Sequence, residues 1–92
     1  MDLLMQIKTS MRIAHEALDA AIQTDIQAGA QDLLRVGVRP FSDDGALREE
    51  PLIWKALELY CKAQADYQGK GADYETSYTR LRDAMSLCGD YR

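Results

Sequence analysis

Two aspartates are the first candidates for chemistry in this chain. Asp25 and Asp32 lie seven residues apart at the edge of an apolar helical stripe, and paired carboxylates can act as general acid and base. Asp32 also precedes Arg35 by three residues, a spacing that favours an ion pair on a helix. We therefore expect solvated or salt-bridged carboxylates here, rather than a catalytic pair.

The other reactive residue types are spaced wrongly for a metal, phosphate or nucleophile site. His15 is the only histidine, which excludes a multi-histidine metal site, and we expect a neutral or capping role for it at a helix start. Cys61 and Cys88 lack the paired spacing of zinc ligands. Reduced, buried thiols are the favoured interpretation, and a disulfide between them stays open. Residues 43–45 lack the ligand pattern of a calcium loop, and residues 69–71 lack that of a phosphate loop. We expect no catalytic residue, no metal, no cofactor and no enzymatic activity.

The composition narrows the class of protein. The chain has 92 residues, of which 47% are hydrophobic and 28% are charged, and this suits one globular domain over residues 1–92. No apolar run approaches the length of about 18 residues that spans a membrane, and the first residues do not resemble a signal peptide. The net charge is −4 and the basic residues are scattered, which argues against sequence-specific nucleic-acid binding.

Apolar residues recur at helical spacing in four segments. The predicted helices cover about residues 2–10, 16–36, 51–68 and 73–88. The predicted fold class is therefore all-α: a single small domain of about four helices, with one longer loop between the second and third. Asp2 can cap the first helix.

Two glycines have specific predicted roles in the second helix. Gly29 lies within the apolar stripe, where glycine costs about 1 kcal/mol relative to alanine, so we expect it to allow the close approach of another backbone. Gly37 is expected to end the helix in a left-handed conformation, with Val38 placed to contact Leu33.

Residues 38–50 form the one substantial predicted loop. Residues 42–45 are typical of a turn, and the apolar residues Val38, Phe41 and Leu47 flank them. This pattern favours a short hairpin. Pro51 then opens the third helix at its first position.

The third helix carries more apolar surface than a small domain readily covers. At about 100° per residue, its apolar side chains fill an arc of roughly 160°, which is wider than the stripe of most surface helices. Trp54 and Cys61 extend this arc toward a charged side that includes Lys55 and Glu58. We therefore expect neighbours on more than one side of the helix, including other subunits. Four tyrosines of the last two helices are expected to pack in the core with their hydroxyls at its rim: Tyr60, Tyr67, Tyr74 and Tyr78.

Taken together, these segments resemble the phage head–tail connector (adaptor) family, small helical proteins that are often labelled DNA-packaging proteins. The residues that carry the resemblance are Leu4-Met5-Gln6-Ile7-Lys8, Met11-Arg12-Ile13, Ala17-Leu18-Asp19-Ala20-Ala21-Ile22, Pro51-Leu52-Ile53 with Ala56, Leu57 and Tyr60, and the closing Tyr74, Tyr78 and Leu81.

The resemblance implies a role in building the virion. Members of that family assemble as a ring, commonly of twelve copies, under the portal protein at the capsid vertex. The ring joins the head to the tail or to tail-completion proteins and lets DNA pass. The implied location is the head–tail junction of the virion, and the host cytoplasm during assembly. The acidic composition agrees with passage of DNA, because like charge repels phosphate.

We predict that the 38–50 loop and the Trp54 end of the third helix contact a neighbouring subunit, and that the C-terminal tail reaches the portal or tail side. The predicted contact residues are Arg39, Phe41, Asp43, Asp44, Leu47, Trp54 and Tyr91. The alternative is a small helical regulator or interaction module that acts as a dimer through a two-fold interface. An enzyme is the least favoured class, and a deep polar cleft holding Asp25 and Asp32 would support it.

Overall fold

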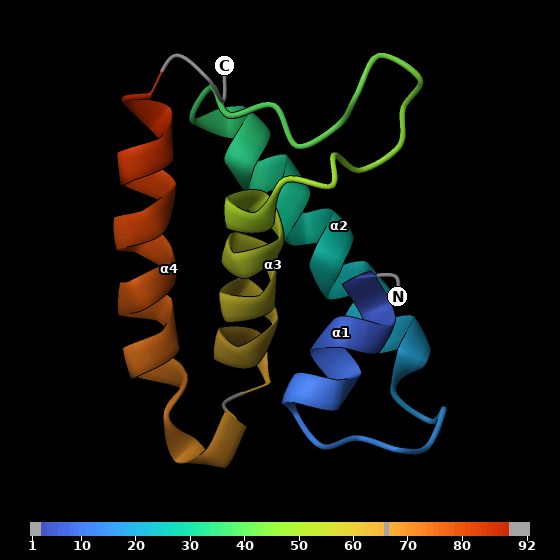
Figure 1. The fold of residues 1–92 in the computed structure, drawn as a ribbon. Coiled ribbons are helices and arrows are strands. Elements are labelled where there is room, and N and C mark those ends of the chain that lie inside the picture. Colours follow the sequence, from blue (N-terminus) through green and yellow to red (C-terminus); the bar gives the residue numbers. More distant parts are fainter. Residues whose placement is uncertain (1–2, 66, 89–92) are drawn as a thin grey trace.

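Four α-helices account for most of the described residues (Figure 1). The computed structural model describes residues 3–65 and 67–88. The helices are α1 (Leu3–Ser10), α2 (Asp19–Arg35), α3 (Pro51–Gln64) and α4 (Gly71–Ser86), with a 3-10 turn at Tyr67–Gly69. The predicted all-α class is confirmed. The predicted cap Asp2, the predicted contact residue Tyr91 and the side chain of Tyr67 lie outside the described part of the chain.

The start of α2 differs from the prediction. The helix begins at Asp19 rather than at Glu16, because the preceding residues form turns. Within them, Nδ1 of the exposed His15 accepts a hydrogen bond from the N–H of Ala17 at 3.3 Å. His15 therefore caps a local turn that precedes the helix, and the helix itself starts four residues later than His15.

The connection between α3 and α4 also differs from the prediction. α3 ends at Gln64, earlier than the predicted end near residue 68. Gln68 and Gly69 have φ values of 54° and 70°, and this left-handed backbone does not continue a helix. α4 then begins at Gly71, two residues before the predicted start at Asp73.

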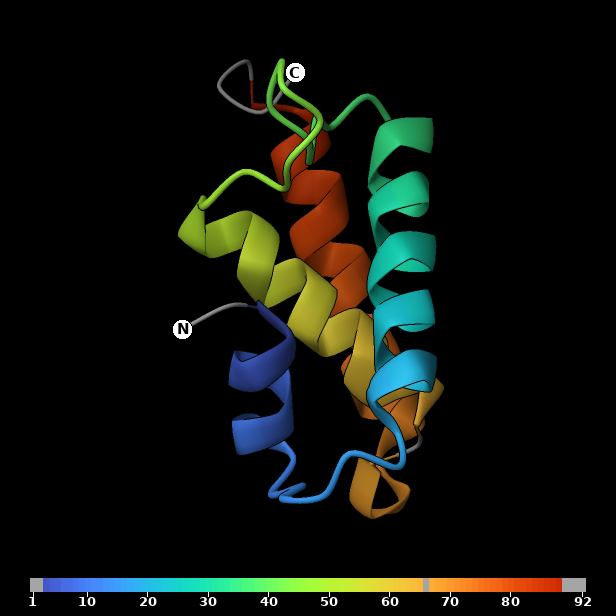
Figure 2. The same cartoon turned by 90° about the vertical axis from the view of Figure 1, so that its right-hand side faces the viewer.

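α3 is the central helix of the domain. It contacts α1, α2 and α4, and α2 and α4 lie on its two sides (Figure 1). This arrangement confirms that the apolar arc of α3 needs neighbours on more than one side. The turned view shows α2 on one face of the molecule, with α1 and the start of α3 on the opposite face (Figure 2). The core between them includes Ile7, Ile22, Ile26, Ala30, Leu33, Ile53, Ala56, Leu57, Cys61, Tyr78 and Met85.

Gly29 lies where α2 meets α3. A Cβ atom at this position would lie 3.0 Å from Cδ2 of Leu57 and 3.1 Å from two ring carbons of Tyr60. The predicted close approach is therefore present, but the groups that come close are side chains of α3, and the expectation of a backbone contact is wrong. A Cβ at this position would be in tight contact with two α3 side chains, which would have to shift by a few tenths of an ångström to accommodate it.

The end of α2 follows the predicted pattern. Gly37 has a φ of +93°, its N–H donates to the carbonyl of Leu34 at 3.0 Å, and the N–H of Val38 donates to the carbonyl of Leu33 at 2.9 Å. These are the two hydrogen bonds of a Schellman cap. Val38 is fully buried, so the cap also directs the following loop back onto the core.

The predicted hairpin forms within residues 38–50. Phe41 and Leu47 pair across it in an isolated antiparallel bridge, and the N–H of Ser42 donates to the carbonyl of Ala46 at 2.8 Å. Gly45 takes a φ of +85° at the turn. Phe41 and Leu47 are half-buried against the core, which anchors the hairpin to the helices.

Candidate functional site

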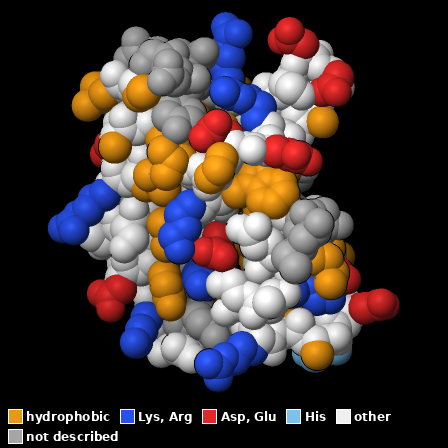
Figure 3. Space-filling view, in the orientation of Figure 1, with side chains coloured by type: hydrophobic (Ala, Val, Ile, Leu, Met, Phe, Trp, Pro, Cys, Tyr) orange, Lys and Arg blue, Asp and Glu red, His pale blue; other side chains and the backbone are white. Residues whose placement is uncertain are grey.

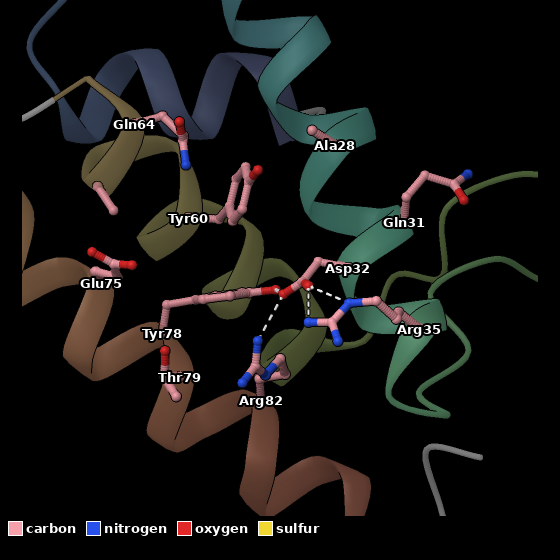
Figure 4. Close-up of a pocket in the computed structure, with 11 residues that line it drawn as sticks. Ala28, Gln31, Asp32, Arg35, Tyr60, Gln64, Glu75, Tyr78, Thr79 and Arg82 are labelled. Atoms are coloured by element: carbon pink, nitrogen blue, oxygen red, sulfur yellow. Dashed lines mark hydrogen bonds and ion pairs between the residues drawn. The ribbon is translucent and has the colours of Figure 1, made fainter.

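Asp32 on α2 accepts hydrogen bonds from three residues, two of which belong to α4 (Figure 4). The hydroxyl of Tyr78 donates to Oδ2 of Asp32 at 2.5 Å, and Nη1 of Arg82 donates to the same oxygen at 3.0 Å. Nη2 of Arg35 donates to Oδ1 at 2.7 Å. The predicted ion pair between Asp32 and Arg35 is confirmed, and the two bonds from α4 show that Asp32 also joins helices.

A hollow of about 460 Å³ lies beside this cluster, lined by residues of α2, α3 and α4. The rings of Tyr60 and Tyr78 pack edge to face with their centroids 5.2 Å apart. The predicted core packing of these tyrosines is confirmed. The hydroxyl of Tyr78 is not at the rim as predicted, because the residue is buried and bonded to Asp32.

The charges of the cluster do not suit acid–base catalysis. Partial burial raises the pKa of the Asp32 carboxyl, but hydrogen bonds from Tyr78, Arg35 and Arg82 outweigh this effect and hold the pKa below its usual value. Burial, together with the bond to Asp32, raises the pKa of Tyr78, so its phenol stays protonated. Asp25 does not line the hollow, and partial burial raises the pKa of its carboxyl. The structure therefore does not bring the two aspartates together in one polar cleft.

We expect Asp32→Asn to lower the free energy of unfolding by about 1–3 kcal/mol at neutral pH, because the buried hydroxyl of Tyr78 and the half-buried guanidinium of Arg82 lose a charged acceptor. A carboxyl whose pKa is lower in the folded state stabilises the fold above its unfolded pKa of about 4 and loses that effect as the pH falls through the folded value. Urea unfolding should therefore separate the native protein from the variant at pH 7, and the difference should shrink below about pH 4.

The matched control is Asp83→Asn. Asp83 is exposed and contacts only one member of the cluster, Arg82, at 3.2 Å. Its removal should change the free energy of unfolding by less than about 0.5 kcal/mol. Equal losses for the two variants, or a loss at Asp32 that persists unchanged at low pH, would contradict the structural role assigned to Asp32.

Both cysteines are free thiols. Cys61 is buried in α3, and burial raises its pKa to about 12, so it stays protonated and unreactive at neutral pH. Cys88 is half-buried after the end of α4. The prediction of a reduced, buried thiol is confirmed for Cys61, and Cys88 is more accessible than predicted.

The hairpin presents several of the predicted contact residues. Arg39, Asp43 and Asp44 are exposed, and the carboxylate of Asp44 accepts hydrogen bonds from the hydroxyl of Ser42 and the N–H of Ala46. Asp44 therefore fixes the turn, while Arg39 and Asp43 extend into solvent. Phe41 and Leu47 pack part of their apolar surface against each other and against the core.

The remaining described contact residue, Trp54, lies in an open groove on the face that carries α1 and the start of α3. The groove has a volume of about 640 Å³. We call it the Trp54 groove; it is lined by Gln6, Glu49, Pro51, Trp54, Lys55 and Glu58. Hydrophobic and acidic side chains lie close together in this region of the surface (Figure 3).

The interior of the Trp54 groove is more polar than an apolar arc alone predicts. Trp54 is half-buried, and its Nε1–H has no hydrogen-bond partner among the described residues. Glu58, predicted on the charged side of the helix, is buried and paired with Nζ of Lys55 at 3.1 Å. Trp54 is therefore not enclosed by its own chain, and apolar surface remains open beside a glutamate-rich lining.

A second surface, on the opposite face, was not among the predicted contact residues. None of the fully exposed residues of α2 before Arg35 is charged. The three aspartates of the helix, Asp19, Asp25 and Asp32, are half-buried. We call it the α2 outer face; it consists of Ala20, Ala21, Gln23, Thr24, Gln27, Ala28, Gln31 and Leu34. The sequence signal was the absence of charge on this side of a helix in a chain where 28% of residues are charged.

None of the described helices is long and apolar enough to cross a membrane. Within residues 3–65 and 67–88, no group of three or more acidic, histidine or cysteine side chains could hold a metal ion.

Comparison with family models, with curated proteins and with solved structures finds no match to this chain.

Proposed function

We propose that this chain is a structural subunit of a phage or prophage head–tail connector, which assembles as a ring under the portal protein and joins the capsid to the tail. The observation that carries this proposal is the Trp54 groove. A tryptophan contributes a large apolar area, and this residue type is enriched at the centre of protein interfaces. In this chain Trp54 stays half-buried in an open groove after all the described helices have packed.

Further apolar side chains support assembly. Leu87 is 82% exposed, and four others are between 42% and 48% exposed, namely Met5, Leu18, Leu34 and Leu52. Single exposed apolar residues are common on monomers, so their number alone does not indicate assembly. Leu18 and Leu34 flank or belong to the α2 outer face, and this places apolar area on the side opposite Trp54 as well.

The net negative charge of the chain is compatible with a position beside DNA, without tight DNA binding. The net charge is −4, and Asp43 and Asp44 are exposed at the hairpin tip. Carboxylates around a channel would repel phosphate and let a duplex slide. On this proposal the partners are copies of the chain, the portal protein, and tail or tail-completion proteins.

One observation favours the second candidate function, a dimeric helical regulator or interaction module. The α2 outer face is uncharged along nearly its whole length, so two copies could pack these faces about a two-fold axis without repulsion. A two-fold contact closes at two subunits, whereas a connector needs a contact that repeats around a ring.

The test is co-expression with the portal protein encoded nearest to this chain in its genome. We expect the two proteins to purify together and to show a ring beneath the portal in electron micrographs. Trp54→Ala and Phe41→Ala should each reduce the bound fraction at least about tenfold, as expected for aromatic contacts at an interface. A stable dimer without portal binding would support the regulator instead, and the absence of a portal gene from the genome would contradict the connector.

A further inference from the structure

We propose that copies of this chain associate head to tail, with the α2 outer face of one copy seated on the Trp54 groove of the next. The occupant of the groove is thus a second copy of this chain. This inference deepens the proposed function, since a ring subunit needs two different, complementary surfaces. It rests on that function only for the ring, because the contact itself can be tested without a portal protein.

The two surfaces have the placement that such a contact requires. α2 covers one face of the molecule, and α1 with the start of α3 lies on the opposite face (Figure 2). A contact between two different surfaces on opposite sides repeats from copy to copy, and it closes into a ring when the rotation per copy allows it. A contact between two identical surfaces would stop at a dimer.

The charges select the α2 outer face as the occupant. Glu49, Lys55 and Glu58 are the charged residues of the groove lining, so this lining carries one net negative charge. The exposed charged residues of α4 are three carboxylates and one cation, namely Asp73, Glu75, Asp83 and Arg80. That side of α4 is therefore net negative, and the groove would repel it. The eight residues of the α2 outer face present no charged group. The exposed Arg35 that follows them is paired with the half-buried Asp32, so these residues bring no uncompensated negative charge to the groove.

The side chains of the two surfaces are also compatible in size and hydrogen bonding. Ala20, Ala21 and Ala28 allow another element to approach the α2 backbone closely, as small residues do at helix contacts. Gln27 and Gln31 offer amide groups to the polar lining of the groove, and Leu34 offers apolar area to Trp54. Interface cores are depleted of charged residues in the same way.

A helix of 17 residues is only about 25 Å long, so this contact alone buries less area than a typical stable complex. We therefore expect weak association of the isolated chain, and the test must trap short-lived contacts. Cysteines at Gln27 on the α2 outer face and at Glu49 on the groove rim serve this purpose, in a Cys88→Ser background. Cys61 can stay because it is buried and remains protonated.

The double variant Gln27→Cys/Glu49→Cys, treated with a short bismaleimide, should give a ladder of covalent oligomers. Each single variant should stay monomeric, and a mixture of the two single variants should stop at a dimer. Cross-linked dimers from Gln27→Cys alone would show a two-fold α2 contact and overturn the proposal. Absence of any product from the double variant would also overturn it.

A charge scan at Gln27 provides an independent readout. In the chain without engineered cysteines, Gln27→Glu should weaken self-association about tenfold through repulsion by the groove. Gln27→Lys should maintain or strengthen it. Sedimentation velocity over a series of high protein concentrations measures both effects. A two-fold α2 contact predicts that both substitutions weaken association, because each charge would then face its own copy. Ser77→Glu and Ser77→Lys on the exposed side of α4 are the matched controls and should change nothing.

The proposed contact between copies and the proposed connector function can fail separately. A ladder without portal binding would support the head-to-tail contact and contradict the connector function. Portal binding without a ladder would support the connector function and contradict this contact between copies.

Discussion

Gly29→Val should lower the free energy of unfolding by about 2–3 kcal/mol, measured by urea unfolding of the isolated chain. The reason is the short distance to α3. A Cβ at Gly29 would already lie 3.0 Å from Leu57 and 3.1 Å from Tyr60. The two further methyl groups of valine have no space there, so α2 and α3 must separate or the tyrosine ring must turn.

Ala28→Val is the matched control. Ala28 is the neighbouring residue on the same helix and is exposed, so valine there carries the helix-propensity cost of about 0.5 kcal/mol without the overlap. Gly29→Ala should lie between the two, because its gain in helix propensity of about 1 kcal/mol opposes the contact with the α3 side chains. Equal stabilities of the two valine variants would contradict the close packing of α2 on α3.

The same substitution bears on assembly. Gly29 sets how far α2 stands from α3, and α3 carries Trp54. Separating the helices would therefore change the relative position of the α2 outer face and the Trp54 groove within one subunit. A ring closes only at a fixed rotation between neighbours. If the proposed connector function holds, the folded fraction of Gly29→Val should therefore form irregular assemblies in place of the proposed rings.

The helices were predictable because local signals coincide along this chain. Apolar residues recur at three and four along each helix, Gly37 supplies the left-handed end of α2, and Pro51 supplies the first position of α3. The hairpin was predictable for the same reason, since its turn residues are contiguous. The start of α2 was not, because the His15 contact that stabilises the preceding turns competes with a helix of similar local propensity.

The surroundings of Asp32 were only partly predictable. The bond to Arg35 follows from a spacing of three residues, but the bonds to Tyr78 and Arg82 join positions 46 and 50 residues away. Helical periodicity indicates which side of a helix is apolar, yet it does not specify which polar residues of another helix will meet it. The burial of Glu58 escaped prediction for that reason too, because its surroundings include residues from outside α3.

The candidate interface was also only partly predictable from the sequence. Trp54 was predictable as the residue that extends the apolar arc of α3. In the structure it lines an open groove, so the described part of the chain does not fully cover its side chain. The α2 outer face was overlooked because its residues are individually unremarkable alanines and glutamines. They form one surface only in the folded chain, because all of them are exposed on α2. α2 lies on the face opposite α1 and the start of α3 (Figure 2).

The buried ion pair between α1 and α2 leads to the second large effect. Nζ of Lys8 lies 2.8 Å from Oδ1 of Asp19, and the Lys8 side chain is only 7% exposed, whereas that of Asp19 is 32% exposed. Asp19→Ala should lower the free energy of unfolding by about 2–3 kcal/mol, because it leaves an ammonium group buried without a counter-charge. Lys8→Met should cost less than Asp19→Ala, because the Asp19 side chain keeps 32% of its surface exposed and the methionine fills the site. Some loss should remain, because Oδ1 of Asp19 is itself buried.

Thermal and urea unfolding of both variants and of the double variant measure this asymmetry. The double variant should be at least about as stable as Lys8→Met alone, since neither retains the buried ammonium group. Equal losses for the two single variants would show that the pair contributes as a surface ion pair, without a desolvated lysine. Because α1 supplies Gln6 to the lining of the Trp54 groove, loss of this pair should also loosen that wall. Asp19→Ala, in the Gln27→Cys/Glu49→Cys background, should then yield a shorter cross-linked ladder than Lys8→Met at temperatures where both remain folded.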